Sequence, residues 1–262
     1  MVFFVGILPA LLTLWIRRGV PESELWIERH TPSKIKGTGS NNELGDAPGI
    51  SRAMAPAPHD SFFAIFRSPY LKNTLVLLLL NFFGLFAWWG MFTWIPPYLS
   101  LPVAQGGRGF GIMGTASLLI VLNLLGMFPG YICFGWLADR LGRRNCFMLY
   151  LFVAALLVPV YAMARSQMVL LIVGTVIAFF GSGFFSGSSL VGSEIFPTRL
   201  RARALGFTYN GARTLSSVAP FVIGRVGQAK GLSWAFYLCG GAYLLAGLMA
   251  TQLPETRGKS LD

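Results

Sequence analysis

Long, nearly uncharged runs of apolar residues limit the possible folds of this chain more than any other feature of its sequence. A helix that crosses the hydrocarbon core of a membrane needs about 20 mostly apolar residues. Seven stretches are candidates for such helices, at residues 1–16, 72–99, 110–136, 146–164, 168–192, 204–224 and 233–252. Only 12% of all residues are charged, about half the share of a soluble domain. The sequence therefore predicts an all-α, polytopic membrane protein with seven transmembrane helices.

The segments between these runs suggest how the chain is organised. Residues 1–16 are expected to form one transmembrane helix, and residues 17–71 a cytoplasmic central loop that is rich in Gly, Pro and Ser and partly disordered. Residues 72–253 are expected to form a six-helix bundle, followed by a cytoplasmic tail at 254–262. Within the loop, residues 60–66 combine a polar start with aromatic residues, which predicts a short interfacial helix.

Basic residues outnumber acidic ones by 21 to 10, which gives a net charge of +11. In a soluble chain this excess would suggest nucleic-acid binding, whereas in a membrane protein it collects in cytoplasmic loops. With seven spans, sixteen basic residues fall on one side, four on the other, and Arg213 lies inside a span. We therefore expect no nucleic-acid partner, a location in the lipid bilayer of the plasma (inner) membrane, and a cytoplasmic C-terminus.

Residues that carry chemistry are sparse. Cys133, Cys146 and Cys239 each lie alone in apolar sequence, and His30 and His59 fall in the polar loop. No Cys or His cluster has metal-ligand spacing, so we expect no metal, disulfide framework or cofactor. The spans also contain no paired carboxylates and no nucleophile spaced with a base, so the sequence predicts no catalytic residues and no enzyme.

The segment between the third and fourth spans carries the most specific motif, Gly-Trp-Leu-Ala-Asp-Arg-Leu-Gly-Arg-Arg at residues 135–144. Gly142 permits a backbone conformation closed to other residues, and Asp139 is placed to meet a helix N-terminus or an arginine. The segment resembles the signature G-x-L-A-D-R-x-G-R-(R/K) of the major facilitator superfamily. A simpler interpretation is a basic cytoplasmic loop without a conformational role.

Three further segments are similar to sugar-porter-like members of that family: Pro21–Trp26, Glu194–Arg201 and Pro254–Leu261. Their order implies that the chain corresponds to helices six to twelve of a twelve-helix transporter. Residues 1–16 would then be the sixth helix, and a first part of five helices would be missing. Such transporters hold their substrate between two six-helix bundles, so the resemblance implies a complementary polypeptide or an N-terminal half as partner.

Arg213 is the sharpest candidate for substrate binding, because a charged residue near the bilayer centre is costly and suggests function. With Tyr209 and Asn210 it resembles the Y-N-x-x-R pattern of organic-acid:proton symporters, which implies that its guanidinium holds a substrate carboxylate. Asn81, Trp88 and Asn123 are further polar or aromatic candidates. Alternatively, Arg213 is satisfied by neighbouring carbonyls or a structural partner, and the aromatic residues face lipid or form an interfacial belt.

A second set of candidates lies at span ends on the expected cytoplasmic side. By motif match, the resemblance implies a gating charge network here, made by Gly135, Asp139, Arg140, Gly142, Arg143, Arg144, Glu194 and Arg201. In the family such residues form salt bridges that hold one transport state and break on opening. Pairing near water contributes only about 0–1 kcal/mol per pair, so gating requires a buried network.

The sequence thus favours alternating-access transport of a small anionic metabolite, an organic acid or a sugar acid. The resemblance implies protons as the coupling ion, although no Asp or Glu lies in the middle of any span. Two alternatives remain: a neutral-sugar or drug transporter of the same superfamily, and a non-transporting half-carrier that binds a partner.

Overall fold

The structure, a computed structural model, describes residues 62–258, and every regular element in that range is a helix. The predicted helix at 1–16 and nearly all of the predicted loop at 17–71 lie outside the described residues. The elements are η1 (Phe62–Phe66), α4 (Leu71–Ser100), η2 (Val103–Gln105), α5 (Gly111–Val121), η3 (Leu122–Met127), α6 (Phe128–Leu141), α7 (Arg143–Met163), α8 (Gln167–Ile195), α9 (Thr198–Ser216), α10 (Ala219–Lys230) and α11 (Leu232–Ala250).

Five helices of the described range are long and apolar enough to cross a membrane: α4, the continuous helix Gly111–Leu141, α7, α8 and α11. They coincide with five of the predicted spans within a few residues at most ends. In Gly111–Leu141, η3 is a short π-helical turn between α5 and α6. The prediction of an all-α polytopic membrane protein is therefore confirmed, whereas the total of seven spans stays a prediction.

The sequence predicts one continuous helix at 204–224, and this is wrong because the chain bends between α9 and α10. Pro220 has no backbone N–H with which to continue the hydrogen-bond ladder of α9. The hydroxyls of Ser216 and Ser217 instead donate to carbonyls of the last turn of α9. The Nε1 of Trp94, on α4, donates to the Pro220 carbonyl at 2.9 Å and ties the bend to the bundle.

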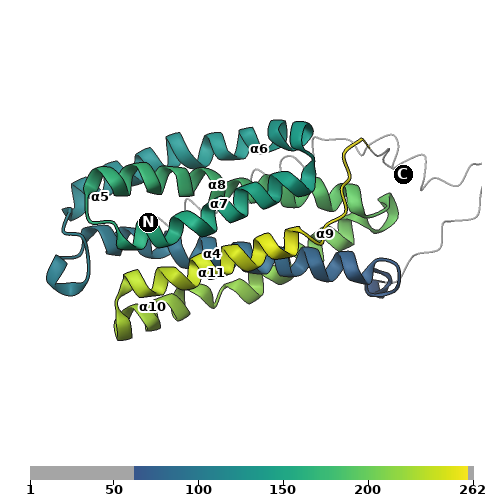
Figure 1. The fold of residues 1–262 in the computed structure, drawn as a ribbon. Coiled ribbons are helices and arrows are strands. Elements are labelled where there is room, and N and C mark those ends of the chain that lie inside the picture. Colours follow the sequence, from purple (N-terminus) through teal and green to yellow (C-terminus); the bar gives the residue numbers. More distant parts are fainter. Residues whose placement is uncertain (1–61, 259–262) are drawn as a thin grey trace, which may run out of the picture. The chain divides into compact units, whose positions relative to one another are not determined.

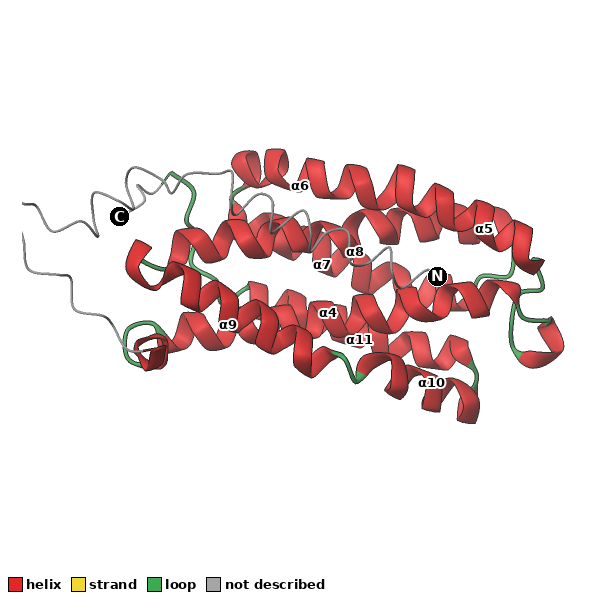
Figure 2. Ribbon diagram, turned by 180° about the vertical axis from the view of Figure 1, so that it is seen from behind, coloured by secondary structure: helices red, strands yellow, loops and turns green. Residues whose placement is uncertain are grey.

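The helices form one bundle in which α5 and α6 run in line along one edge, and α10 and α11 lie at the opposite edge (Figures 1 and 2). Helix α11 packs against α7 and α4, and α8 packs against α6, η3 and α7. Glycines bring α6 close to α8: a side chain at Gly130 would collide with the backbone carbonyl of Phe179. This contact is the close helix packing that small residues allow in membranes.

A smaller apolar cluster forms where the chain enters α4. The 3-10 helix η1 buries Ile65 against Phe196 and Leu200, near the start of α9. The hydroxyl of Thr74 donates to the Ile65 carbonyl at 2.8 Å. The part of the predicted interfacial helix 60–66 that the structure describes is therefore helical and packs onto the bundle.

Candidate functional site

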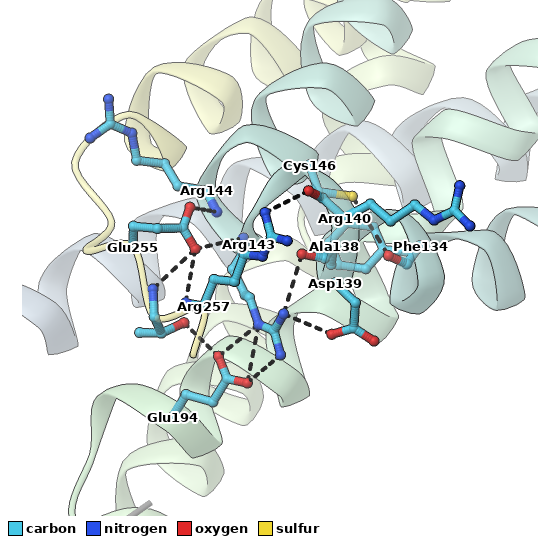
Figure 3. Close-up of polar contacts among 11 residues, drawn as sticks. Phe134, Ala138, Asp139, Arg140, Arg143, Arg144, Cys146, Glu194, Glu255 and Arg257 are labelled. Atoms are coloured by element: carbon cyan, nitrogen blue, oxygen red, sulfur yellow. Dashed lines mark hydrogen bonds and ion pairs between the residues drawn. The ribbon is translucent and has the colours of Figure 1, made fainter. Parts of the chain in front are cut away.

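Three of the predicted gating residues, Asp139, Arg143 and Glu194, meet where α6 ends and α7 begins. The Arg143 guanidinium donates to the Glu194 carboxylate, with the shortest N···O distance 2.9 Å, and to Asp139 Oδ1 at 2.7 Å (Figure 3). The side chains of Arg143 and Glu194 are each 13% exposed, whereas that of Asp139 is 68% exposed. The Arg143–Glu194 pair is therefore the inner contact and the Asp139 pair a solvated outer one.

The chain after α11 returns to the same place. The Glu255 carboxylate accepts hydrogen bonds from the backbone N–H groups of Arg143 at 2.8 Å and Arg144 at 3.2 Å, the first two residues of α7. Free N–H groups and the helix dipole make a helix N-terminus favourable for a negative charge. Glu255 therefore caps α7 from a segment more than 100 residues later in the chain.

Two more contacts fasten this segment. The Thr256 hydroxyl donates to Glu194 Oε2, and Arg257 Nη1 donates to the Arg140 carbonyl at 2.7 Å. We call Arg143, Glu194, Glu255, Thr256 and Arg257 the tail clasp. It joins the α6–α7 turn, the end of α8 and the segment after α11 into one polar unit (Figure 3).

The other residues of the predicted network have different surroundings. Gly142 forms the turn with a φ of 92°, and the Arg140 guanidinium lies 3.9 Å over the ring of Trp136. Gly135 has open space beside its Cα. Arg144 takes part only through its backbone N–H, which donates to the Glu255 carboxylate. Arg201 on α9 takes no part in the two salt bridges of residues 62–258, and its buried Nε has no hydrogen-bond partner there.

Gly142→Ala is expected to destabilise the bundle more than Gly231→Ala. The two glycines have nearly equal backbone angles, with φ/ψ of 92°/154° and 91°/151°. A Cβ at position 142 would lie 2.5 Å from Glu255 Oε2, whereas at position 231 it meets nothing within 4 Å. Backbone strain costs each variant about 1–3 kcal/mol of stability. The additional loss of stability in Gly142→Ala then measures the steric conflict with Glu255 in the tail clasp. Thermal unfolding in detergent checks this, and equal melting temperatures would contradict it.

The tail clasp is expected to open in acid. Burial by itself raises the pKa of Glu255, but four backbone N–H donors outweigh it, so the pKa lies below the ordinary value. The stabilisation is therefore full above about pH 4.3 and is lost as the pH falls through the lowered folded-state pKa. Hydrogen exchange of residues 254–258, corrected for intrinsic rates, should show protection at pH 7 that disappears at acid pH.

The matched variants separate this cap from general acid unfolding. Glu255→Gln should remove the pH dependence of exchange in residues 254–258, whereas Asp139→Asn should leave it unchanged, because Asp139 does not contact those residues. If the exchange of residues 254–258 depended on pH equally in Glu255→Gln and in the wild-type chain, another group would hold this segment.

The predicted substrate residues on α9 share one face of that helix. Tyr209 and Arg213 are four residues apart and Asn210 and Arg213 three, so their side chains are neighbours on the helix surface. Arg213 and Asn210 are exposed, and Asn210 donates to the Gly206 carbonyl one turn earlier. Within residues 62–258 the Arg213 guanidinium has no hydrogen bond or ion pair.

Asn81 and Trp88 lie two turns apart on α4. Asn81 is completely buried and its Oδ1 accepts a hydrogen bond from the Ser188 hydroxyl at 2.7 Å, so it joins α4 to α8. The Trp88 ring meets Phe92 and Phe185 at centroid distances of 5.2 and 5.3 Å. The Asn81 Nδ2 and the Trp88 Nε1 are buried donors without a partner in this range.

Asn123 lies apart from these groups, in the π-helical turn η3, where it is exposed and donates to the Leu119 carbonyl at 2.8 Å. The sequence analysis did not select Phe185, Ser188, Glu255 or Thr256 as site residues. Of these four residues, only Glu255 and Thr256 could have been found from the sequence, because they lie in the motif Pro254–Leu261. The described residues hold no group of three or more His, Cys, Asp or Glu side chains that could bind a metal.

Comparisons with known proteins show which family the chain is similar to. The family described as Major Facilitator Superfamily matches residues 107–261, more than half of the chain. A "Putative metabolite transport protein" of Haemophilus influenzae is 26% identical over 99% of this chain and 59% of its own length. The "Sialic acid transporter NanX" of Escherichia coli is 27% identical over 96% of this chain and 55% of its own length. The chain thus spans little more than half the length of these curated relatives.

A solved structure shares the fold. The peptide transporter POT in complex with sulfate superposes with a TM-score of 0.59 at 21% identity, over 68% of this chain and 37% of that one. At this identity the similarity concerns the arrangement of helices alone.

Proposed function

Because the chain belongs to the Major Facilitator Superfamily, we propose that it forms one half of a secondary transporter whose substrate is a small organic anion. The chain is an integral, multi-pass membrane protein. Its family and its transporter-named relatives also confirm the prediction that it is not an enzyme.

Arg213 carries this proposal. A cationic side chain at membrane depth is expensive and has to be paired. The described range contains three carboxylates, Asp139, Glu194 and Glu255, and all lie at the tail clasp, at the far end of α9 from Arg213. A carboxylate-bearing substrate would supply the missing charge, because a guanidinium binds a carboxylate through two parallel hydrogen bonds. The relative named for sialic acid, an acidic sugar, supports the same class of ligand.

The neighbouring side chains fit such a ligand. On our proposal Tyr209 and Asn210 donate hydrogen bonds to the substrate bound at Arg213, because they share its face of α9. On α4, Trp88 offers an aromatic ring and an Nε1 donor, and Asn81 an Nδ2 donor, neither of which has a partner within residues 62–258. Asn123 lies in the exposed π-helical turn and would meet the substrate or the second half of the transporter.

The tail clasp suits a conformational lock. We propose that it holds this end of the half-transporter closed in one state and loosens as the two halves rock during alternating access. The partly buried Arg143–Glu194 pair supports this role, because it is less screened by water than a surface pair. Under the predicted orientation the clasp faces the cytoplasm, as does the C-terminus.

Proton coupling belongs to the same proposal. None of the three described carboxylates lies in the middle of a membrane-spanning helix. On our proposal the titrating group is therefore supplied by a complementary polypeptide, whose five helices would also complete the substrate cavity.

The experiment compares vesicles that hold the chain alone with vesicles that hold it together with a complementary polypeptide of five helices, with and without a pH gradient. The proposal expects uptake of radiolabelled organic acids only with both halves, accelerated by an inward proton gradient. Uptake of neutral sugars or drugs instead would favour a neutral-sugar or drug transporter of the same superfamily. Stable pairing without uptake of any compound would favour a non-transporting half-carrier.

A further inference from the structure

An apolar groove runs along α11 on the surface of the bundle. It has a volume of about 530 Å³ and lies where α4, α10 and α11 meet. Its walls include Phe82, Phe83, Phe86, Val222, Gly241 and Leu245. The space beside Gly241 is open, because a Cβ at this position would meet no atom within 4 Å. A groove on a membrane-spanning helix has an apolar lining suited to a hydrocarbon chain.

The groove continues toward the start of α11. A second hollow, of about 490 Å³, shares Tyr237 and Leu238 with the first. Its rim carries Arg225 and Lys230 from α10 and Trp234 from α11. The result is a slot that is apolar along its length and has two cations at one end.

Within residues 62–258 these two cations have no counter-ion. The carboxylates of the described range are at the tail clasp, which follows the far end of α11, about 28 Å along a 19-residue helix. Both basic side chains are exposed, as is Trp234 at 62%. Tryptophan at this level is typical of the boundary between hydrocarbon and headgroups. The mouth of the slot is therefore positively charged and includes a tryptophan of the kind found at headgroup depth.

We propose that this slot binds one anionic phospholipid, with an acyl chain in the apolar groove and its phosphate between Arg225 and Lys230. The length, the apolar lining and the position of the charges match an amphiphile that is anionic at one end. A soluble anion would use the two cations but leave the groove empty. A neutral phospholipid would fill the groove but leave the net positive charge uncompensated. This binding is independent of transport.

Native mass spectrometry of the full 262-residue chain in detergent tests the proposal. Phosphatidylglycerol is titrated against phosphatidylcholine with matched acyl chains, and the chain should retain one phosphatidylglycerol molecule preferentially. The double variant Arg225→Gln, Lys230→Gln should weaken that binding by about fivefold for each charge removed. Arg165→Gln, an exposed arginine in the loop at the same end of the bundle, is the matched control and should leave it unchanged.

A steric variant tests the groove itself. Gly241→Phe should fill the open space and reduce retention of both lipids, whereas Ile172→Phe, on the exposed face of α8, should not. Free glycerol phosphate should not displace phosphatidylglycerol. Equal retention of both lipids in the unchanged chain, equal losses in Arg165→Gln and the double variant, or displacement by glycerol phosphate would each overturn the proposal.

Discussion

Arg213→Ala is expected to reduce substrate uptake by about 30-fold or more in the complete transporter, while the level of the protein in the membrane stays normal. Truncating one partner of a hydrogen-bonded charge pair away from water costs about 2–5 kcal/mol. Arg213 is exposed and unpaired within the described residues, so its loss removes no hydrogen bond or ion pair of that range. Initial rates of labelled uptake, normalised to membrane protein level, measure the effect.

Two further variants show whether charge or geometry matters at this position. Arg213→Lys keeps the charge but loses the planar two-point contact, so uptake should recover only in part. Arg165→Ala, outside the helices, should transport normally. Undiminished uptake by Arg213→Ala would rule out a carboxylate-binding role, and loss of the protein from the membrane would assign Arg213 a structural one.

The second large effect is expected at the tail clasp. Glu194→Ala should lower the free energy of unfolding by about 2–3 kcal/mol, because it leaves the Arg143 guanidinium and the Thr256 hydroxyl without their shared acceptor. Asp139→Asn should cost less than about 1 kcal/mol, since its carboxylate is 68% exposed. Unfolding of the purified chain in detergent measures both, and equal losses would contradict the division into inner and outer contacts.

Asp139→Asn is nevertheless expected to change transport. On our proposal the substitution weakens the outer contact between Arg143 and residue 139. It should therefore slow interconversion of the transport states more than it weakens substrate binding. Uptake kinetics separate the two effects: the maximal rate should fall while the half-saturating concentration stays close to normal. A pure loss of affinity at an unchanged maximal rate would contradict the gating role.

Hydrophobicity alone predicts most of this fold. The predicted span 72–99 is α4, Leu71–Ser100, and 168–192 lies within α8, Gln167–Ile195, because long apolar runs can satisfy their backbone only as helices in a membrane. The span 204–224 fails for two reasons. Helix α9 starts at Thr198, in a basic stretch that hydropathy does not detect, and Pro220 interrupts the predicted run.

Contacts of the candidate site could be predicted only where the two residues are close in sequence. Asp139 and Arg143 lie in one ten-residue motif on either side of the Gly142 turn, so the sequence already places them close together. The cap on α7 by Glu255 joins residues 112 positions apart, and Asn81 and Ser188 are 107 apart. Nothing in one sequence specifies such distant pairs, because they depend on how the helices pack. The motif around Glu255 marked the segment but not its contact.

The central claim, transport of a small organic anion held by Arg213, is tested most directly by paired substrates. The measurement is uptake of labelled benzoate and benzamide, and of a sugar acid and its parent sugar, by vesicles holding the chain with its complementary half. Each pair differs mainly in the carboxylate. We predict uptake of one or both acids, neither of the neutral compounds, and loss of acid uptake in Arg213→Ala. Equal uptake of acid and neutral compound would contradict the account.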